Sequence, residues 1–191
     1  MRLKTFFPAL ALLALPALAQ GSVQGGFQVG LMNPMGGSSS GNSVSAKDWV
    51  DSKIGATVGG HVSWDLNGGH MVRLRLDSSA VSGQPLNGGG SGFDTRINTI
   101  GLMGDYVFHV SGKVEGFYLT AGLGFERTRL EAEFGGVTDS ESASAMAMAV
   151  GLGFRFNRLV GLEFRYITSH PDIAGFTFKN DRGTAGVSFS F

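Results

Sequence analysis

The sequence has 191 residues, no cysteine, only five prolines, and 16% charged residues. Without cysteine, the chain cannot form a disulfide framework or a thiolate metal site. Basic and acidic residues are equal in number at 15 each, so the charge balance gives no sign of the basic surface that binds nucleic acid. After residue 20 the chain also lacks an apolar run long enough to cross a bilayer as a helix. We therefore predict no nucleic-acid partner, and we expect any crossing of a membrane to be made by strands.

Glycine and phenylalanine are abundant, with 31 and 15 residues. Glycine at more than twice its usual ~7% is typical of a disordered chain, or of a structure in which many positions have no room for a side chain. Disordered chains are poor in aromatic residues. Because aromatic residues make up 10% of this chain, the second explanation is favoured.

Residues 1–19 have the features of a secretory signal peptide. Two basic residues near the start precede an apolar stretch over 6–18, which ends on an Ala-Leu-Ala cleavage site. This stretch of 13 residues is shorter than the roughly 20 that a spanning helix needs. We predict cleavage between Ala19 and Gln20, which leaves a mature domain over 20–191.

Eight segments of the mature chain alternate, with a period of two, between large apolar residues and small or polar residues. This is the pattern of β-strands that have two different faces. In one segment, for example, Phe117, Leu119 and Phe125 share a face, with Gly122 and Glu126 on the other. The segments are 23–32, 53–64, 70–77, 97–108, 116–127, 144–156, 160–168 and 183–191.

The connections between these segments are alternately long and short. Tight periplasmic turns, longer extracellular loops and an even number of strands are typical of outer-membrane barrels. The pattern predicts an all-β fold, an eight-stranded antiparallel transmembrane β-barrel in up-and-down meander order, whose lumen is filled by side chains. The expected long loops are 33–52, 78–94, 130–142 and 169–182.

The soluble alternative is a β-sandwich or a lipocalin-like barrel, in which the apolar face is buried and the polar face is exposed. Here the polar face consists mostly of Gly, Ala, Ser and Thr, which is unusual for a solvated surface. The other face carries Phe, Leu and Val without a charge in its central band. Small residues inside and bulky apolar residues outside favour a barrel that faces lipid.

Two strand endings carry a resemblance to a known family. The terminal Val187-Ser188-Phe189-Ser190-Phe191 resembles the C-terminal insertion signal of the small outer-membrane β-barrel family, the OmpA/OmpX-like transmembrane domains of Gram-negative bacteria. Gly104-Asp105-Tyr106-Val107-Phe108 also resembles strand endings of that family. The resemblance covers 20–191 and implies an outer-membrane location, with lipid and lipopolysaccharide as surroundings. It also implies that the barrel-assembly machinery reads Phe189 and Phe191 as the membrane-insertion signal.

Several charged side chains lie on the inward face of the predicted strands, at similar depth. Buried charges persist only when they are paired and hydrogen-bonded. Arg73 or Arg75 can pair with Asp105 on the next strand, whereas Glu163 and Arg165 need partners across the lumen. We expect these five residues to form an ion network in the lumen. The alternative is a gate whose ion pairs rearrange to admit ions or small solutes.

On this basis the sequence favours a structural or surface-interaction scaffold without catalysis. A narrow channel for ions or small solutes is the first alternative, and an outer-leaflet lipid-modifying hydrolase is the second. For hydrolysis, the sequence offers Ser169, His170 and Asp172 close together. Adjacent residues of an extended chain point to opposite faces, which disfavours a pairing of Ser169 with His170. The Ser-His-Pro-Asp stretch also does not resemble the motifs of lipid A deacylases or palmitoyltransferases.

The loops are the remaining candidates for recognition, because loops on a rigid scaffold commonly bind ligands. We expect their aromatic residues to be exposed, where they would bind a partner or pack against lipopolysaccharide headgroups. Arg127 and Arg129 would suit lipopolysaccharide phosphates. No cofactor is predicted, the four histidines are scattered over different segments, and the extracellular ligand is not identified by the sequence. The aromatic loop residues are Trp49, Phe93, Phe134, Phe176 and Phe178.

Overall fold

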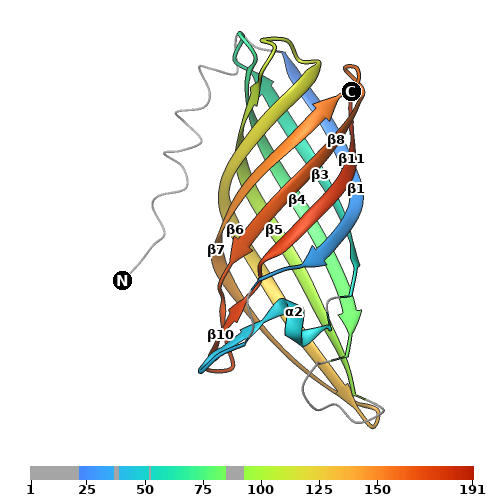
Figure 1. The fold of residues 1–191 in the computed structure, drawn as a ribbon, viewed down its shortest axis with the longest axis vertical. Helices are drawn as coiled ribbons and strands as arrows, with labels where there is room; N and C mark the ends of the chain where they lie inside the picture. The colour runs from blue at the N-terminus through green and yellow to red at the C-terminus, as the bar shows by residue number, and fades with distance from the viewer. Residues whose placement is uncertain (1–21, 37–38, 52, 85–92) are drawn as a thin grey trace.

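The computed structural model describes residues 22–36, 39–51, 53–84 and 93–191. The predicted signal peptide and its cleavage site at Ala19 and Gln20 lie outside these residues. Eight antiparallel strands close into a barrel, and each strand pairs with its neighbours along the chain, as in a meander (Figure 1). The barrel strands are β1 (Val23–Pro34), β3 (Gly55–Asp65), β4 (His70–Gly83), β5 (Phe93–His109), β6 (Gly116–Phe134), β7 (Val137–Arg155), β8 (Val160–Ser169) and β11 (Arg182–Ser190).

The predicted fold class is confirmed, including the pairing of the last strand with the first. In the β1–β11 register, Phe27 pairs with Phe189 and their rings stack at 4.9 Å between centroids. Short turns over 66–69, 110–115 and 156–159 define what we call the turn end, at the top of Figure 1 with the C-terminus. The opposite end, where the loops gather, is the loop end.

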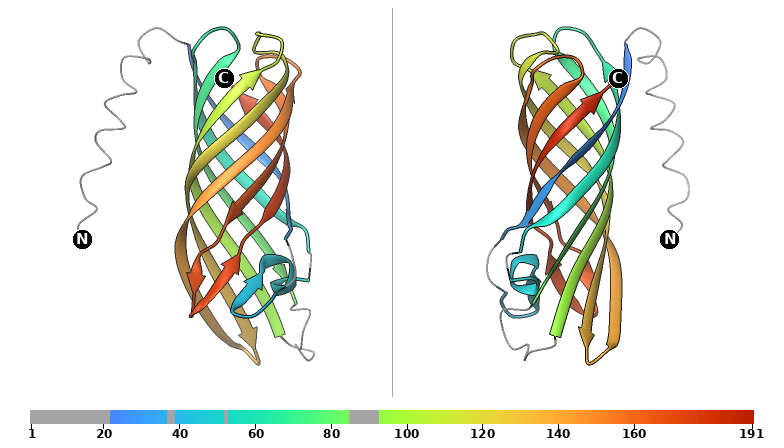
Figure 2. Two further views of the ribbon diagram at one scale, coloured as in Figure 1. Left: turned by 60° about the vertical axis from the view of Figure 1, so that its left-hand side comes forward. Right: turned by 90° about the vertical axis from the view of Figure 1, so that its right-hand side faces the viewer.

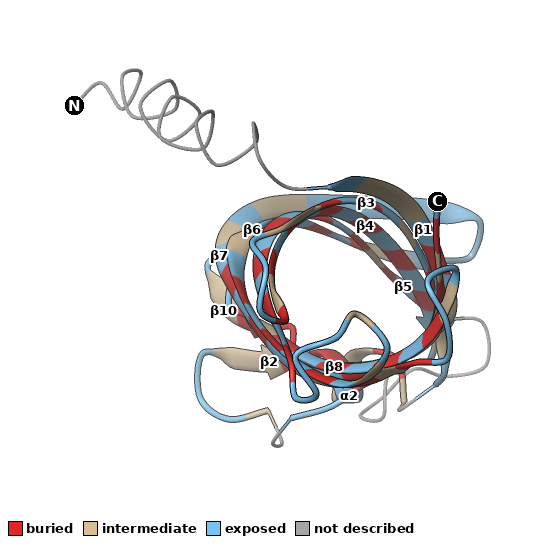
Figure 3. Ribbon diagram, turned by 90° about the horizontal axis from the view of Figure 1, so that it is seen from above, coloured by how far each residue is buried: buried red, intermediate tan, exposed pale blue. Residues whose placement is uncertain are grey.

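The alternation of sequence along each strand becomes an alternation of burial (Figure 3). Bulky apolar residues face outward over the whole barrel wall, as Leu123 and Phe125 show at 60% and 61% exposure. Small and polar residues face inward, where space is short. An added Cβ at Gly124, for instance, would lie 2.1 Å from the carbonyl oxygen of Leu102 on the neighbouring strand. The structure therefore confirms the prediction that the apolar face points outward and the small, polar face points into the lumen.

The strands β4, β5, β6 and β7 extend well beyond their predicted ranges at the loop end, so two predicted loops are partly or almost wholly strand. β4 runs to Gly83 and β5 begins at Phe93, so 78–83 and 93–94, at the two ends of the predicted loop, are strand. β6 and β7 pair throughout 130–142, apart from a two-residue turn at Gly135 and Gly136. Both glycines have positive φ, 59° and 82°, as a tight hairpin turn requires. In this extension of β6 and β7 the outward side chains are charged or polar. The alternation of apolar residues therefore ends there, although the backbone pairing continues.

The other two loops fold into a small cap. β2 (Ser43–Ser45), β9 (Asp172–Ile173) and β10 (Phe176–Lys179) form a three-stranded sheet, and α2 (Ala46–Trp49) follows β2 directly. This cap lies beside the long strands β4–β7, beyond the ends of β1, β8 and β11 (Figures 1 and 2). No helix among the described residues is both long and apolar enough to cross a membrane.

A local hydrogen-bond cluster holds the start of the cap. The Ser45 hydroxyl accepts from the Asp48 backbone N–H at 3.1 Å and so caps α2. The backbone N–H and the hydroxyl of Ser39 both donate to Asp48 Oδ2, at 2.7 and 2.8 Å. These two hydrogen bonds, the backbone one above all, lower the pKa of Asp48 below its usual value. These side-chain contacts join the start of the cap to the first turn of α2.

Candidate functional site in the barrel lumen

The structure brings all five charged residues of the predicted ion network together in the middle of the lumen. Arg73 Nη1 donates to Glu163 Oε2 at 2.8 Å, across the lumen from strand β4 to strand β8. Arg75 also donates to Glu163, and its Nε lies 3.3 Å from Asp105 Oδ2. Arg165 Nη2 donates to Asp105 Oδ1 at 2.7 Å. Each of the five residues is at most 4% exposed.

A sixth charged residue, Asp77, belongs to the same group. Its Oδ2 lies 3.4 Å from Arg165 Nη1, and its Oδ1 accepts from Gln28 Nε2 at 3.0 Å. Asp77 has the same parity as Arg73 and Arg75 on β4, so the sequence pattern placed it on the inward face although the predicted network left it out. We call these six residues the central network: Arg73, Arg75, Asp77, Asp105, Glu163 and Arg165.

The central network is balanced in charge, with three arginines and three carboxylates. Buried ion pairs are tolerated when additional hydrogen bonds satisfy their remaining polar atoms. Tyr118 supplies one such bond, because its hydroxyl donates to Glu163 Oε2 at 2.9 Å. The network links β4, β5 and β8 across the barrel and occupies space that a solute would need.

A second ion pair lies nearer the loop end. Arg182, the first residue of β11, makes two hydrogen bonds to the Glu126 carboxylate, one of them at 2.9 Å. Both side chains are buried, at 2% and 3% exposure. The sequence placed Glu126 on the inward face, but Arg182 lay in the predicted loop 169–182, so this pair was missed.

The residues proposed for hydrolysis do not assemble into a nucleophile, a base and a carboxylate. Ser169 Oγ donates to Glu126 Oε2 at 2.9 Å inside the lumen. His170 is exposed, and its Nε2 lies 3.4 Å from Asp181 Oδ1. Asp172 accepts from Thr177 at 3.0 Å. Ser169 and His170 thus face opposite sides of the chain, as the extended backbone predicted.

An apolar cluster lies at the loop end of the lumen. Inward residues of β1, β4, β5 and β6 pack there against residues of the cap, and Phe178 lies at the cluster with 0% exposure. Trp49 contacts the Phe178 ring edge-on at 6.4 Å between centroids. We call the buried members the loop-end plug: Met32, Ala46, Val50, Val81, Ile97, Leu130, Ile173 and Phe178.

The plug corrects the expectation that the loop aromatic residues are exposed. Phe178 is fully buried, and Trp49 and Phe176 are partly buried against the plug. Only Phe134, with 62% exposure, lies on the surface as expected, while the side chain of Phe93 falls outside the described part. The apolar cap residues pack into the barrel mouth because burial of their aromatic surface stabilises a folded loop.

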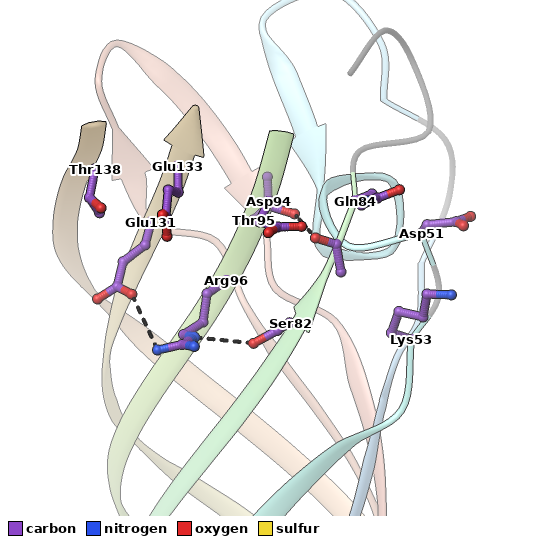
Figure 4. Close-up of a pocket in the computed structure, with 11 residues that line it drawn as sticks. Asp51, Lys53, Ser82, Gln84, Asp94, Thr95, Arg96, Glu131, Glu133 and Thr138 are labelled. Atoms are coloured by element: carbon purple, nitrogen blue, oxygen red, sulfur yellow. Dashed lines mark hydrogen bonds and ion pairs between the residues drawn. The ribbon is translucent and has the colours of Figure 1, made fainter. Parts of the chain in front are cut away.

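The outer surface of the loop end carries polar side chains. Arg127 and Arg129 are exposed on β6 and donate to Ser142 and Ser140 of β7, both at 3.0 Å. An open cavity of about 710 Å³ lies between the ends of β4, β5 and β6 (Figure 4). Its charged lining residues are Asp51, Lys53, Asp94, Arg96, Glu131 and Glu133.

Among the lining residues that the structure describes, Glu131 makes ion pairs to Arg96 at 3.8 Å, inside the cavity (Figure 4), and to Arg129 at 3.1 Å, on the outer wall. Four carboxylates against two cations give the cavity an acidic lining. No group of three or more metal-ligating side chains occurs among the described residues.

Comparisons with known proteins agree on the architecture. The family model described as outer membrane protein beta-barrel domain matches residues 5–191. Comparison with curated protein sequences gives no significant match.

Three solved structures are similar in fold. Ail, the attachment invasion locus protein of Yersinia pestis in complex with the heparin analogue sucrose octasulfate, has 14% identity and a TM-score of 0.59, covering 89% of this chain and 99% of its own. Neisserial surface protein A has 15% identity and a TM-score of 0.58, with coverages of 90% and 99%. The N-terminal β-barrel domain of Pseudomonas aeruginosa OprF has 13% identity and a TM-score of 0.52, with coverages of 90% and 100%. At these identities the likeness concerns the fold.

Proposed function

This chain belongs to the outer membrane protein β-barrel family, and from that premise we propose that it is a closed scaffold, which displays its loop end at the cell surface without conducting solutes. Outer-membrane barrels place short turns in the periplasm and longer loops outside. The cap and the acidic cavity would then face the exterior, and the turn end with the C-terminus would face the periplasm. Export through the cleaved signal peptide over 1–19 is part of this proposal.

The observation that carries the proposal is the stacking of blocking layers in the lumen. The loop-end plug lies at the outer mouth, and the Glu126–Arg182 pair and the central network follow beneath it. Between these two charged layers, Met103 and Ile167 form a further buried apolar cluster with Ala147 and Ala149. Eight-stranded barrels have an interior just wide enough for side chains to fill, so these four layers leave little room for a hydrated ion.

The surface that remains for recognition is the loop end. The solved structure of Ail contains a sulfated heparin analogue. The cavity of this chain is lined by more carboxylates than cations, which favours a ligand with positive charge over a sulfated one. The exposed Arg127 and Arg129 on the outer wall suit the phosphates of surrounding lipopolysaccharide.

Single-channel recording separates the scaffold from the channel alternative. Purified protein inserted into planar bilayers is expected to give no discrete conductance steps, because the plug and the central network block the lumen. Insertion is verified independently by protease protection of the barrel in the same lipid. Reproducible ion-conducting steps from the verified protein would contradict the scaffold proposal and support the narrow channel.

A further inference from the structure

Among the described residues, one buried arginine of the lumen makes no ion pair at the turn end, and the half-buried Asp65, on the inward face of β3 there, makes none either. The described inward side chains include five buried arginines and four buried carboxylates. The central network and the Glu126–Arg182 pair use all four carboxylates and four of the arginines. Asp181, which is also largely buried, contacts exposed His170 rather than a lumen arginine. The remaining cation is Arg155, the last residue of β7.

Arg155 is held by neutral partners. Its Nη2 donates to Ser190 Oγ at 2.9 Å, and its Nη1 donates to Gln24 Oε1 at 3.4 Å. Within the described part of the chain, no carboxylate lies within salt-bridge distance of its guanidinium, although the side chain is only 5% exposed. A buried charge without a counter-charge is costly, so the site calls for a compensating anion.

Two further buried polar side chains without a hydrogen-bond partner lie at the same end of the lumen, on β5 and β3. Both ring nitrogens of His109, which is 2% exposed, lack a hydrogen-bond partner, and so does the hydroxyl of Ser63, which is 1% exposed. Ser63 pairs in the β1–β3 register with Gln24, whose side-chain oxygen accepts the hydrogen bond from Arg155. The His109 ring packs on Tyr118 at 5.3 Å between centroids. Neutral histidine and serine can each donate one hydrogen bond to an anion.

We propose that the turn end of the lumen binds a small inorganic anion, of the size of chloride or phosphate, on Arg155, His109 and Ser63. The anion neutralises Arg155, the one buried arginine among the described residues that makes no ion pair with a carboxylate. This site lies at the opposite end of the lumen from the cap, and it requires neither a surface ligand nor a conducting pore.

The first test compares the unfolding temperature of the detergent-purified protein in sodium gluconate, chloride and phosphate at equal ionic strength. Chloride or phosphate at about 150 mM is expected to raise the midpoint by about 3 °C over gluconate, which is too bulky for the site. The effective salt identifies the anion. The rise is expected to vanish in Arg155→Gln and to shrink in His109→Phe, which keeps the ring contact with Tyr118.

Arg158→Gln is the matched control, because Arg158 is exposed on the adjacent turn and the substitution removes the same charge. This variant is expected to keep the full response to the anion. A wild-type midpoint that is equal in all three salts, or an equal response in Arg155→Gln, would overturn the proposal.

Crystals grown in bromide give a direct readout that does not depend on any variant. An anomalous peak within hydrogen-bond distance of the Arg155 guanidinium is expected. A peak that appears only at molar bromide, with no effect of anions on stability in solution, would mean an adventitious ion only and would overturn the proposal. Water alone at this position would do the same.

Discussion

Replacing Glu163 by glutamine is expected to lower the free energy of unfolding by about 3–5 kcal/mol. The Glu163 carboxylate accepts hydrogen bonds from Arg73, Arg75 and Tyr118. Its removal leaves two buried arginines competing for the remaining carboxylates of the central network. Urea unfolding of the purified barrel in lipid vesicles, followed by tryptophan fluorescence, measures the loss.

Glu115→Gln provides the control, because Glu115 is exposed on the 110–115 turn and the charge change is the same. It is expected to change stability by less than about 0.5 kcal/mol. The double variant Glu163→Gln with Arg73→Gln is expected to lose less unfolding free energy than the sum of the two single variants, because either substitution alone already breaks the interaction between the two side chains. Additive losses would show that Arg73 and Glu163 are not coupled and would contradict the network.

Replacing Phe178 by alanine is expected to open the loop-end plug. Truncation of a buried phenylalanine typically costs about 3–5 kcal/mol of stability. Here we expect the substitution to destabilise the cap and to leave the paired barrel strands stable. Hydrogen exchange of the β2 and β10 amides is expected to accelerate at least ~100-fold, while the amides of the paired barrel strands keep their protection.

Phe176→Ala tests whether the effect comes from burial in the plug. Phe176 lies on the same short strand but is only partly buried, so the acceleration is expected to be clearly smaller. If the two variants behave alike, or if Phe178→Ala exposes the whole barrel to exchange, the cap is not the separate folding unit that its packing indicates.

The faces of the barrel were predictable because strand geometry imposes a period of two. Parity alone placed Arg75 and Asp105 inward and Leu123 outward, as the structure has them. The loop ends of the long strands were not predictable in the same way. Around Arg129 and Glu131, charged residues occupy the outward positions, so the alternation in polarity stops although backbone pairing continues.

The cap could not be derived from the sequence, because it depends on contacts between segments far apart in the chain. Trp49 meets Phe178 only once both loops fold into the barrel mouth. Arg155 illustrates a different limit. Its parity indicates that it faces inward, but the absence of a carboxylate beside it becomes visible only when the neighbouring strands are in place.

Cysteine accessibility tests the closure of the lumen most directly, since the chain has no cysteine of its own. Thr99 lies inward on β5, beneath the plug, at 3% exposure, and its hydroxyl accepts from Asn180 at 3.3 Å. Thr99→Cys in the membrane-inserted protein is expected to react with a charged thiol reagent about 1,000-fold more slowly than Ser140→Cys on the exposed hairpin. Equal rates at the two positions would mean an open lumen and would contradict the account.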